Sequence, residues 1–214
     1  MRLLRVDKNG DFSTLTEDKV GDIPVYAILS HTWGADQDEV TFRDMNTNLR
    51  TDKVGYKKLE FCAKQAAKDE LQFIWVDTCC IDKANNTELS EAINSMFRWY
   101  QRSKRCYVFL PDVQVEGDNP ATCTAVWLPQ FRKSRWFTRG WTLQELLAPS
   151  SVEFFCADGK KLGDKTSLDR ELSEITGISI QALQGKPLSK FTVSERFSWT
   201  ESRQTKREED MVRD

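Results

Sequence analysis

The sequence predicts an α/β fold in which helices flank a parallel sheet. Continuous apolar runs of strand length occur at residues 25–30, 73–77 and 106–110, as expected for strands that are buried on both faces. Helix patterns with one apolar face lie between these runs, at residues 55–69 and 88–100,. Strands that alternate with helices pair in parallel through right-handed crossovers. The three runs are therefore expected to belong to one parallel sheet.

A short N-terminal hairpin is predicted before the first of these strands. Residues 2–6 have an alternating apolar face, and residues 11–15 form the returning segment. Asn9-Gly10 between them is a turn signal that is typical of hairpins. The chain is therefore expected to begin with two short paired strands.

The first buried strand opens into a polar loop, His31-Thr32-Trp33-Gly34. Open α/β sheets bind ligands just beyond the carboxyl ends of their strands, where backbone N–H groups and short side chains converge. The loop is therefore a candidate ligand site. His31 is the one imidazole in the chain, and the sequence leaves two interpretations open for it, a hydrogen-bonded structural residue or a ligand contact.

The second buried strand ends in Asp77. A carboxylate at this position either caps the backbone or faces a ligand, and the sequence does not separate the two interpretations. The polar loop at 83–87 follows and leads into a helix, with Glu88 and Glu91 expected in its first turn. Stabilisation of the helix start is a sufficient explanation of both glutamates, since negative charge complements the helix dipole there.

The segment from Ser134 to Pro149 combines three aromatic side chains, two arginines and one carboxylate. A short helix is predicted over 140–148, which places Trp141 and Glu145 four residues apart on one face. A carboxylate beside an indole is poorly solvated, which suits a proton carrier or a counter-charge to a developing cation. The alternative is a surface glutamate on a helix whose tryptophan belongs to the core.

The last third of the chain is expected to be mostly helical. After a further strand at 152–155, a helix pattern ends at Gly177. Thr192 and Glu195 then have the spacing of a capping box that opens another helix,.

Length and composition indicate one domain with an extension. A chain of 214 residues with 39% hydrophobic content can bury one good-sized core,. We expect residues 1–160 to form one α/β domain and residues 161–214 a helical C-terminal extension of the same domain. The sequence leaves open whether this extension is truncated after the charged segment 206–214.

Charge and residue usage disfavour several classes of protein. Thirty-one Lys and Arg against 33 Asp and Glu give a net charge of −2, which provides no attraction to nucleic acid or anionic membranes. There is no signal-peptide pattern and no apolar run near the ~20 residues of a membrane span. We therefore expect a cytoplasmic protein with neither a membrane span nor a nucleic-acid partner. With one histidine and six cysteines that lack CxxC spacing, no metal site is expected, and the cysteines are interpreted as small core residues.

Three blocks of the sequence resemble the fungal HET (heterokaryon incompatibility) domain. They are residues Tyr26 to Gly34, Trp75 to Lys83 together with Glu88 to Tyr100, and Trp136 to Leu146. The resemblance implies a role in allorecognition and programmed cell death in filamentous fungi. It also implies that the domain is the N-terminal effector of a larger, NLR-like receptor, whose NACHT and WD-repeat modules would be scaffold partners in cis.

The HET domain is in turn similar to the TIR (Toll/interleukin receptor) domain, which implies a TIR-like, flavodoxin-like sheet. Many TIR domains cleave NAD with a glutamate four residues after a tryptophan, the spacing of Trp141 and Glu145. The resemblance therefore implies that Glu145 is catalytic and that NAD is a substrate, with no cofactor required. It implies self-association through the loop Asp82 to Thr87. The substrate-binding residues that we predict with it are Ser30, His31, Thr32, Trp33, Gly34, Asp77, Cys80, Arg139 and Trp141.

Two functions from different classes remain open on these grounds. In the first, the domain is an NAD nucleosidase, in which Glu145 stabilises a cationic ribosyl transition state and an aromatic ring stacks on a base. In the second, the domain is a non-enzymatic signalling adaptor that associates with itself and binds a nucleotide or a partner domain.

Overall fold

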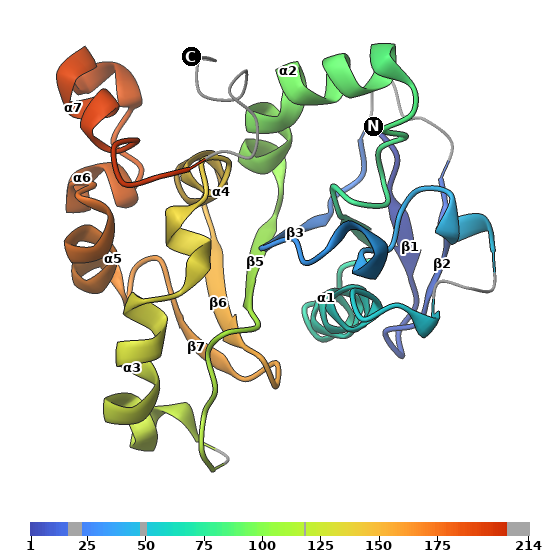
Figure 1. Ribbon diagram of the computed structural model, residues 1–214, viewed down its shortest axis with the longest axis horizontal. Coiled ribbons are helices and arrows are strands. Elements are labelled where there is room, and N and C mark those ends of the chain that lie inside the picture. Colours follow the sequence, from blue (N-terminus) through green and yellow to red (C-terminus); the bar gives the residue numbers. More distant parts are fainter. Residues whose placement is uncertain (17–22, 48–50, 118, 205–214) are drawn as a thin grey trace. The chain divides into compact units, whose positions relative to one another are not determined.

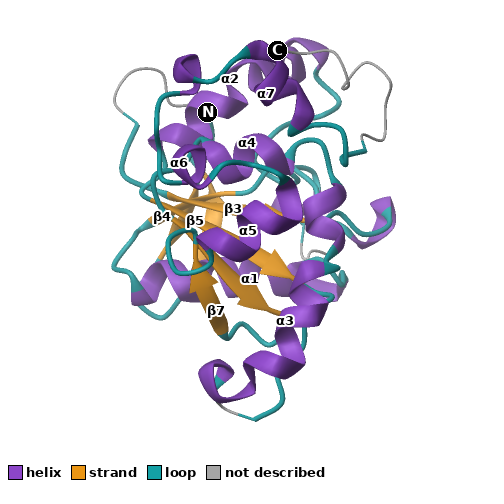
Figure 2. Ribbon diagram, turned by 90° about the vertical axis from the view of Figure 1, so that its left-hand side faces the viewer, coloured by secondary structure: helices purple, strands orange, loops and turns teal. Residues whose placement is uncertain are grey.

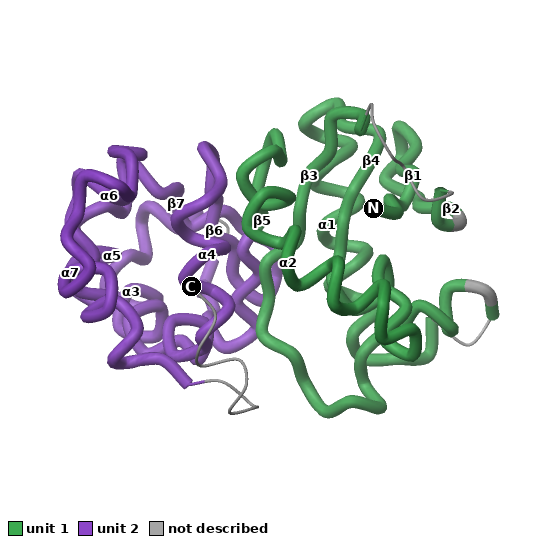
Figure 3. The backbone as a smooth tube through the Cα atoms, turned by 90° about the horizontal axis from the view of Figure 1, so that it is seen from above, with its two compact units in different colours: residues 1–107 green, residues 108–214 purple. Residues whose placement is uncertain are grey.

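The computed structural model describes residues 1–16, 23–47, 51–117 and 119–204. The chain divides into two compact units, residues 1–107 (unit 1) and 108–214 (unit 2), which Figure 3 shows in different colours. The predicted division at residue 160 stays a prediction, and the charged segment 206–214 lies outside the described residues.

Unit 1 holds the N-terminal hairpin and the parallel strands (Figure 1). Its strands are β1 (Leu4–Val6), β2 (Phe12–Leu15), β3 (Ala27–His31), β4 (Phe73–Trp75) and the first half of β5 (Arg105–Leu110). β1 pairs antiparallel with both β2 and β4, and β3 pairs in parallel with β4. The predicted hairpin is confirmed. Its turn needs Gly10, because φ is +83° and a Cβ there would lie 2.8 Å from the backbone of Lys64,.

Two helices accompany these strands, α1 (Tyr56–Lys68) and α2 (Asn86–Arg102). α1 packs on β3 and β4 through its apolar face, as its spacing predicts,. Asn85 caps α2, since its side chain accepts the backbone N–H groups of Thr87 and Glu88,. The helix therefore begins at Asn86, and Glu88 but not Glu91 lies in its first turn. Short 3₁₀ segments at Asp36–Asp38 and Asp44–Asn46 lie between β3 and α1.

Unit 2 is built around an aromatic core. Its strands β6 (Val152–Cys156) and β7 (Lys161–Asp164) pair antiparallel, and α3 (Thr124–Arg132) and α4 (Thr142–Leu147) precede them. Edge-to-face contacts join Phe131 to Phe137 and Phe154, and Trp136 to both of the latter rings,. The sequence predicted β6 and α4, but not α3 or β7. Further 3₁₀ segments lie at Pro120–Cys123 and Arg135–Thr138.

The rest of unit 2 is helical (Figure 2). It contains α5 (Asp169–Thr176), α6 (Ile180–Leu183), a 3₁₀ segment at Leu188–Lys190 and α7 (Val193–Ser198). α5 ends at Gly177 in the left-handed conformation, with φ of +70°,. The capping box is present at the start of α7, where Thr192 and Glu195 bond each other's backbone N–H groups. Both predictions from the sequence are confirmed.

The seven strands follow the order β2-β1-β4-β3-β5-β6-β7, and the unit boundary falls within β5. The fold is therefore of the predicted α/β class, with a mixed sheet that has a parallel pair inside it and antiparallel pairs toward its edges. Within the described ranges, no helix is long and apolar enough to cross a membrane. All six cysteines are free thiols, and Cys123 is the one that is not fully buried.

Candidate functional site

The carboxyl ends of β3 and β4 position the first group of candidate residues. The two strands run in parallel, with Ala27 opposite Ile74 and Ile28 opposite Trp75. The segments that follow them, residues 32–34 and 76–80, therefore leave the sheet at the same edge. This edge is the usual ligand-binding position of an open α/β sheet.

Two side chains from the first segment contact Asp77 from the second. The Trp33 Nε1–H donates to Asp77 Oδ2 at 2.8 Å, and His31 Nε2 lies 3.4 Å from Asp77 Oδ1. The His31 side chain is almost fully buried, whereas 19% of the Asp77 side chain is exposed. Burial raises the pKa of the Asp77 carboxyl, while the Lys83 charge and the Trp33 hydrogen bond oppose this shift,. Asp77 thus faces the side chains of the predicted ligand loop.

Lys83, from the loop before α2, adds a cation to this group. Its Nζ lies 3.6 Å from the centroid of the Trp33 ring, which is a close cation–π contact,. The residue as a whole is exposed, but its ammonium is partly desolvated there. This desolvation lowers the pKa of Lys83, and the negative charge of Asp77 opposes the shift. We call His31, Trp33, Asp77 and Lys83 the strand-end cluster.

A buried ion pair holds the segment that carries Trp33. The Lys58 Nζ donates to Glu39 Oε1 at 2.5 Å and to Oε2 at 2.7 Å, and it lies 3.4 Å from the Thr32 carbonyl oxygen. The Gly34 N–H donates to Glu39 Oε1 at 2.6 Å. Gly55 lets the chain approach closely here, since a Cβ would lie 2.6 Å from the Asp38 carbonyl oxygen,.

The sequence did not indicate this ion pair. Lys58 lies four residues before Cys62 on the apolar face of α1, so the helix period placed it toward the core. The partner, Glu39, comes from a loop and has no sequence signal of its own.

Except for Gly34, which is exposed, the remaining predicted residues of unit 1 are buried within the unit. Ser30 is fully buried at the end of β3, and Thr32 is also buried. Cys80 lies in the core, where its Sγ accepts the Val76 N–H at 3.3 Å. The pKa of the neighbouring Cys79 thiol is raised by its hydrogen bond with Cys80 and by burial. Contact of these residues with a substrate stays a prediction.

Glu145 occupies the first turn of α4 in unit 2. Only 7% of the residue is exposed, so the interpretation as a surface glutamate is wrong. Its N–H lies 3.4 Å from the carbonyl oxygen of Trp141, which precedes the helix and is half-buried. The predicted short helix and the burial of its carboxylate are confirmed.

Arg203 is the charged neighbour of Glu145 that the sequence did not indicate. Its NH1 group donates to the Arg139 carbonyl oxygen at 3.0 Å and to Thr142 Oγ1 at 2.6 Å, and its Nε donates to the Trp199 carbonyl oxygen at 3.3 Å. Burial lowers the pKa of Arg203 to about 10, and the negative charge of Glu145 opposes this shift. Arg203 lies 61 residues beyond Thr142 in the chain, so no local pattern connects them.

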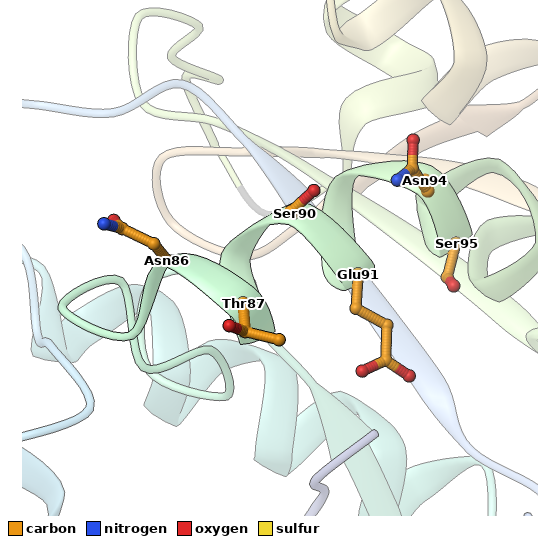
Figure 4. A pocket seen from close by; sticks show the side chains of 6 residues that line it. All are labelled: Asn86, Thr87, Ser90, Glu91, Asn94 and Ser95. Carbon is orange, nitrogen blue, oxygen red and sulfur yellow. The ribbon is translucent and has the colours of Figure 1, made fainter.

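A hollow also lies along α2 (Figure 4). Figure 4 shows Thr87, Glu91 and Ser95 on one side of the helix, at four-residue spacing. The described residues that line the hollow are all polar: Asn86, Thr87, Ser90, Glu91, Asn94 and Ser95. Small-molecule sites are predominantly apolar and aromatic with a few polar groups. The strand-end cluster fits that description better, because it combines an indole with a few charged groups.

The structure therefore groups His31, Trp33 and Asp77 as the sequence suggested. Arg139 and Glu145 belong to unit 2, where Arg139 precedes α4 and Glu145 lies in it.

Residues 26–127 match the model of the family described as "Heterokaryon incompatibility protein (HET)". This part of the chain is a HET domain. The chain is also 52% identical over 212 residues to the vegetative incompatibility protein HET-E-1 of Podospora anserina. That alignment covers 99% of this chain, which spans 16% of the length of the relative. No solved structure matches the fold.

The HET match contains the whole strand-end cluster and ends before α4. The predicted resemblance to the HET domain is thus confirmed. Glu145 lies outside the matched range, but the alignment with HET-E-1 extends over nearly the entire chain.

Proposed function

We propose that this HET domain is a cell-death effector of fungal vegetative incompatibility. The observation that carries the proposal is the 52% identity to a protein named for vegetative incompatibility, over 99% of this chain. Since the chain spans 16% of that relative, the proposal includes further domains in cis. In this proposal they are receptor modules, of the nucleotide-binding and repeat types, that control the effector.

The proposed chemistry is hydrolysis of the N-glycosidic bond of NAD. The bond between the ribose C1′ and the nicotinamide nitrogen breaks, nicotinamide leaves as a neutral molecule, and water adds to C1′ with release of a proton. A neutral leaving group needs no general acid, so one carboxylate is sufficient, unlike the paired carboxylates of most glycosidases. Glu145 is proposed to stabilise the positive charge that develops on the ribose.

Two features support this assignment. Glu145 has the spacing from Trp141 that the TIR resemblance predicts, and it is held in a buried position at a helix start. In unit 1, the strand-end cluster offers an indole ring and an ammonium at the edge of the sheet where nucleotides commonly bind,. Both are groups that recognise the aromatic and anionic parts of a dinucleotide.

The experiment compares Glu145→Gln with a matched control, Glu153→Gln. Glu153 is equally buried, at 7% exposed, but it lies in β6 and pairs with Lys161. We expect Glu145→Gln to lower NAD turnover by about 100-fold or more, the usual loss when an electrostatic stabiliser is removed. Killing of fungal cells should be lost with it, while Glu153→Gln retains both. Circular dichroism and thermal unfolding verify that each variant is folded.

A folded Glu145→Gln protein that cleaves NAD and kills cells like the wild type contradicts the enzymatic proposal. Killing without any NAD loss favours the alternative, a self-associating adaptor. The observation in its favour is the loop Asp82 to Thr87, where residues 83–87 are exposed. The same loop is held in shape by Asp82, whose Oδ1 accepts the Ala84 N–H at 3.1 Å.

A further inference from the structure

Trp33 has an indole that is oriented and polarised by a carboxylate. Its Nε1–H donates to Asp77 Oδ2 at 2.8 Å, which fixes the plane of the ring at the edge of β3 and β4. A hydrogen bond from the N–H to a carboxylate pushes electron density into the ring. The faces of an indole attract cations, and they do so more strongly when the cation is desolvated. Trp33 is thus prepared to receive a positive charge.

The chain supplies such a charge from an exposed loop. Lys83 Nζ lies 3.6 Å from the ring centroid, at the end of a flexible four-carbon side chain. The loop backbone does not depend on this side chain, because Asp82 and Asn85 hold it: Asp82 accepts the Ala84 N–H, and Asn85 caps α2. The ammonium can therefore leave the ring while the loop keeps its shape.

The charges around the ring select what can replace the ammonium. Glu39 is neutralised by its ion pair with Lys58. The positive charge of Lys83 acts on the Asp77 carboxylate. When the Lys83 ammonium leaves the ring, the carboxylate beside the indole loses this positive charge. A ligand that restores the balance must carry a positive charge, and a flat ring covers an indole face better than an ammonium does.

We propose that the Trp33 indole is the binding platform for a cationic aromatic ring of the pyridinium class, and that Lys83 occupies this platform until the ligand displaces it. The inference rests on the proposed function in that NAD carries such a ring. Lys83 is then a built-in competitor, which lowers the apparent affinity by the fraction of molecules in which it covers the ring.

The experiment measures binding and not turnover. The probes are 1-methylnicotinamide, a pyridinium cation without a ribose, and nicotinamide, the neutral ring of the same shape. Each is titrated by calorimetry into the wild-type domain, into Lys83→Gln, and into Lys104→Gln as a control. Lys104 is an exposed lysine of unit 1 that lies before β5.

We expect Lys83→Gln to bind the cation about fivefold more tightly than the wild type, the gain from removing a competing contact of ordinary cation–π strength. Lys104→Gln should bind like the wild type, and neutral nicotinamide should bind more weakly than the cation. Trp33→Phe keeps a ring but loses the bond to Asp77, so it should bind the cation several-fold more weakly than the wild type.

Three results overturn the inference. The first is that the wild-type domain binds the cation and the neutral ring equally well. The second is that Lys83→Gln binds the cation no more tightly than the wild type does. The third is that neither the wild type nor Lys83→Gln shows measurable binding of the cation. Because 1-methylnicotinamide has no glycosidic bond, the outcome is independent of Glu145. If the domain binds the cation but does not cleave NAD, the proposed function alone is refuted. If it cleaves NAD but does not bind the cation, this inference alone is refuted.

Discussion

The buried ion pair between Glu39 and Lys58 gives the sharpest test of how unit 1 is stabilised. The side chains are 7% and 10% exposed, and the ammonium contacts both carboxylate oxygens. Lys58→Met removes the cation and leaves the Glu39 carboxylate buried without its ion-pair partner, although the Gly34 N–H still donates to it. Breaking a buried pair in this way costs about 3–5 kcal/mol of unfolding free energy. For a chain of this length, that corresponds to a fall of roughly 6–20 °C in the thermal midpoint.

The measurement is urea unfolding followed by tryptophan fluorescence. The control is Lys64→Met on the same helix. The Lys64 Nζ lies 3.4 Å from Glu60 Oε1, and the two side chains are 59% and 44% exposed, respectively. This exposed pair should contribute only about 0.5 kcal/mol or less. The double variant Glu39→Gln with Lys58→Met removes both charges but keeps an acceptor for Gly34, so it should recover about 2 kcal/mol. The reasoning is refuted if Lys58→Met loses no more stability than Lys64→Met.

Two further predictions concern unit 2 and the pH dependence. Arg203→Met removes a buried cation and its hydrogen bonds next to α4, so it should lower the unfolding free energy by about 2–4 kcal/mol. The control is Arg170→Met, at an exposed position, and an equal loss of stability in both variants contradicts the prediction. The Ser167 backbone N–H holds the pKa of Asp164 below its ordinary value of 3.8, so its stabilisation is present above about pH 4 and is lost as the pH falls through the folded pKa. Burial raises the pKa of Asp77, so its contribution instead declines as the pH rises from about 4 through the folded pKa. Asp164→Asn and Asp77→Asn should therefore change the slope of unfolding free energy against pH in opposite directions, which urea unfolding at a series of pH values measures.

Local patterns predicted the elements whose signals are complete within a few residues. β3 begins in the apolar run at residues 25–30, and α1 has a regular apolar face. Gly177 marks the end of α5, and the capping box of Thr192 marks the start of α7. α3 was missed because Pro129 lies inside it, at a position where proline normally disfavours a helix,. β7 was missed because it is a short edge strand with one buried residue, Leu162,.

The candidate site was predictable to the extent that strand ends define it. His31, Trp33 and Asp77 follow directly from the position of β3 and β4. Glu39 and Arg203 were not predictable, because each meets its partner through the fold. A glutamate or an arginine outside a helix or strand is usually solvated, and only the burial of Glu39 and Arg203 shows otherwise,.

The contact between residue 204 and the start of α4 determines how short a fragment of this protein can be. The Gln204 N–H donates to the Thr138 carbonyl oxygen at 2.6 Å, and the Gly140 N–H donates to the Gln204 carbonyl oxygen at 2.9 Å. Gln204 thereby forms a parallel bridge with Arg139, directly before the helix that carries Glu145. A fragment cut at residue 127, where the family match ends, lacks α4 itself, and one cut at residue 160 keeps α4 without this support. Expression of a fragment that keeps Glu145 in its buried position therefore requires the chain through Gln204.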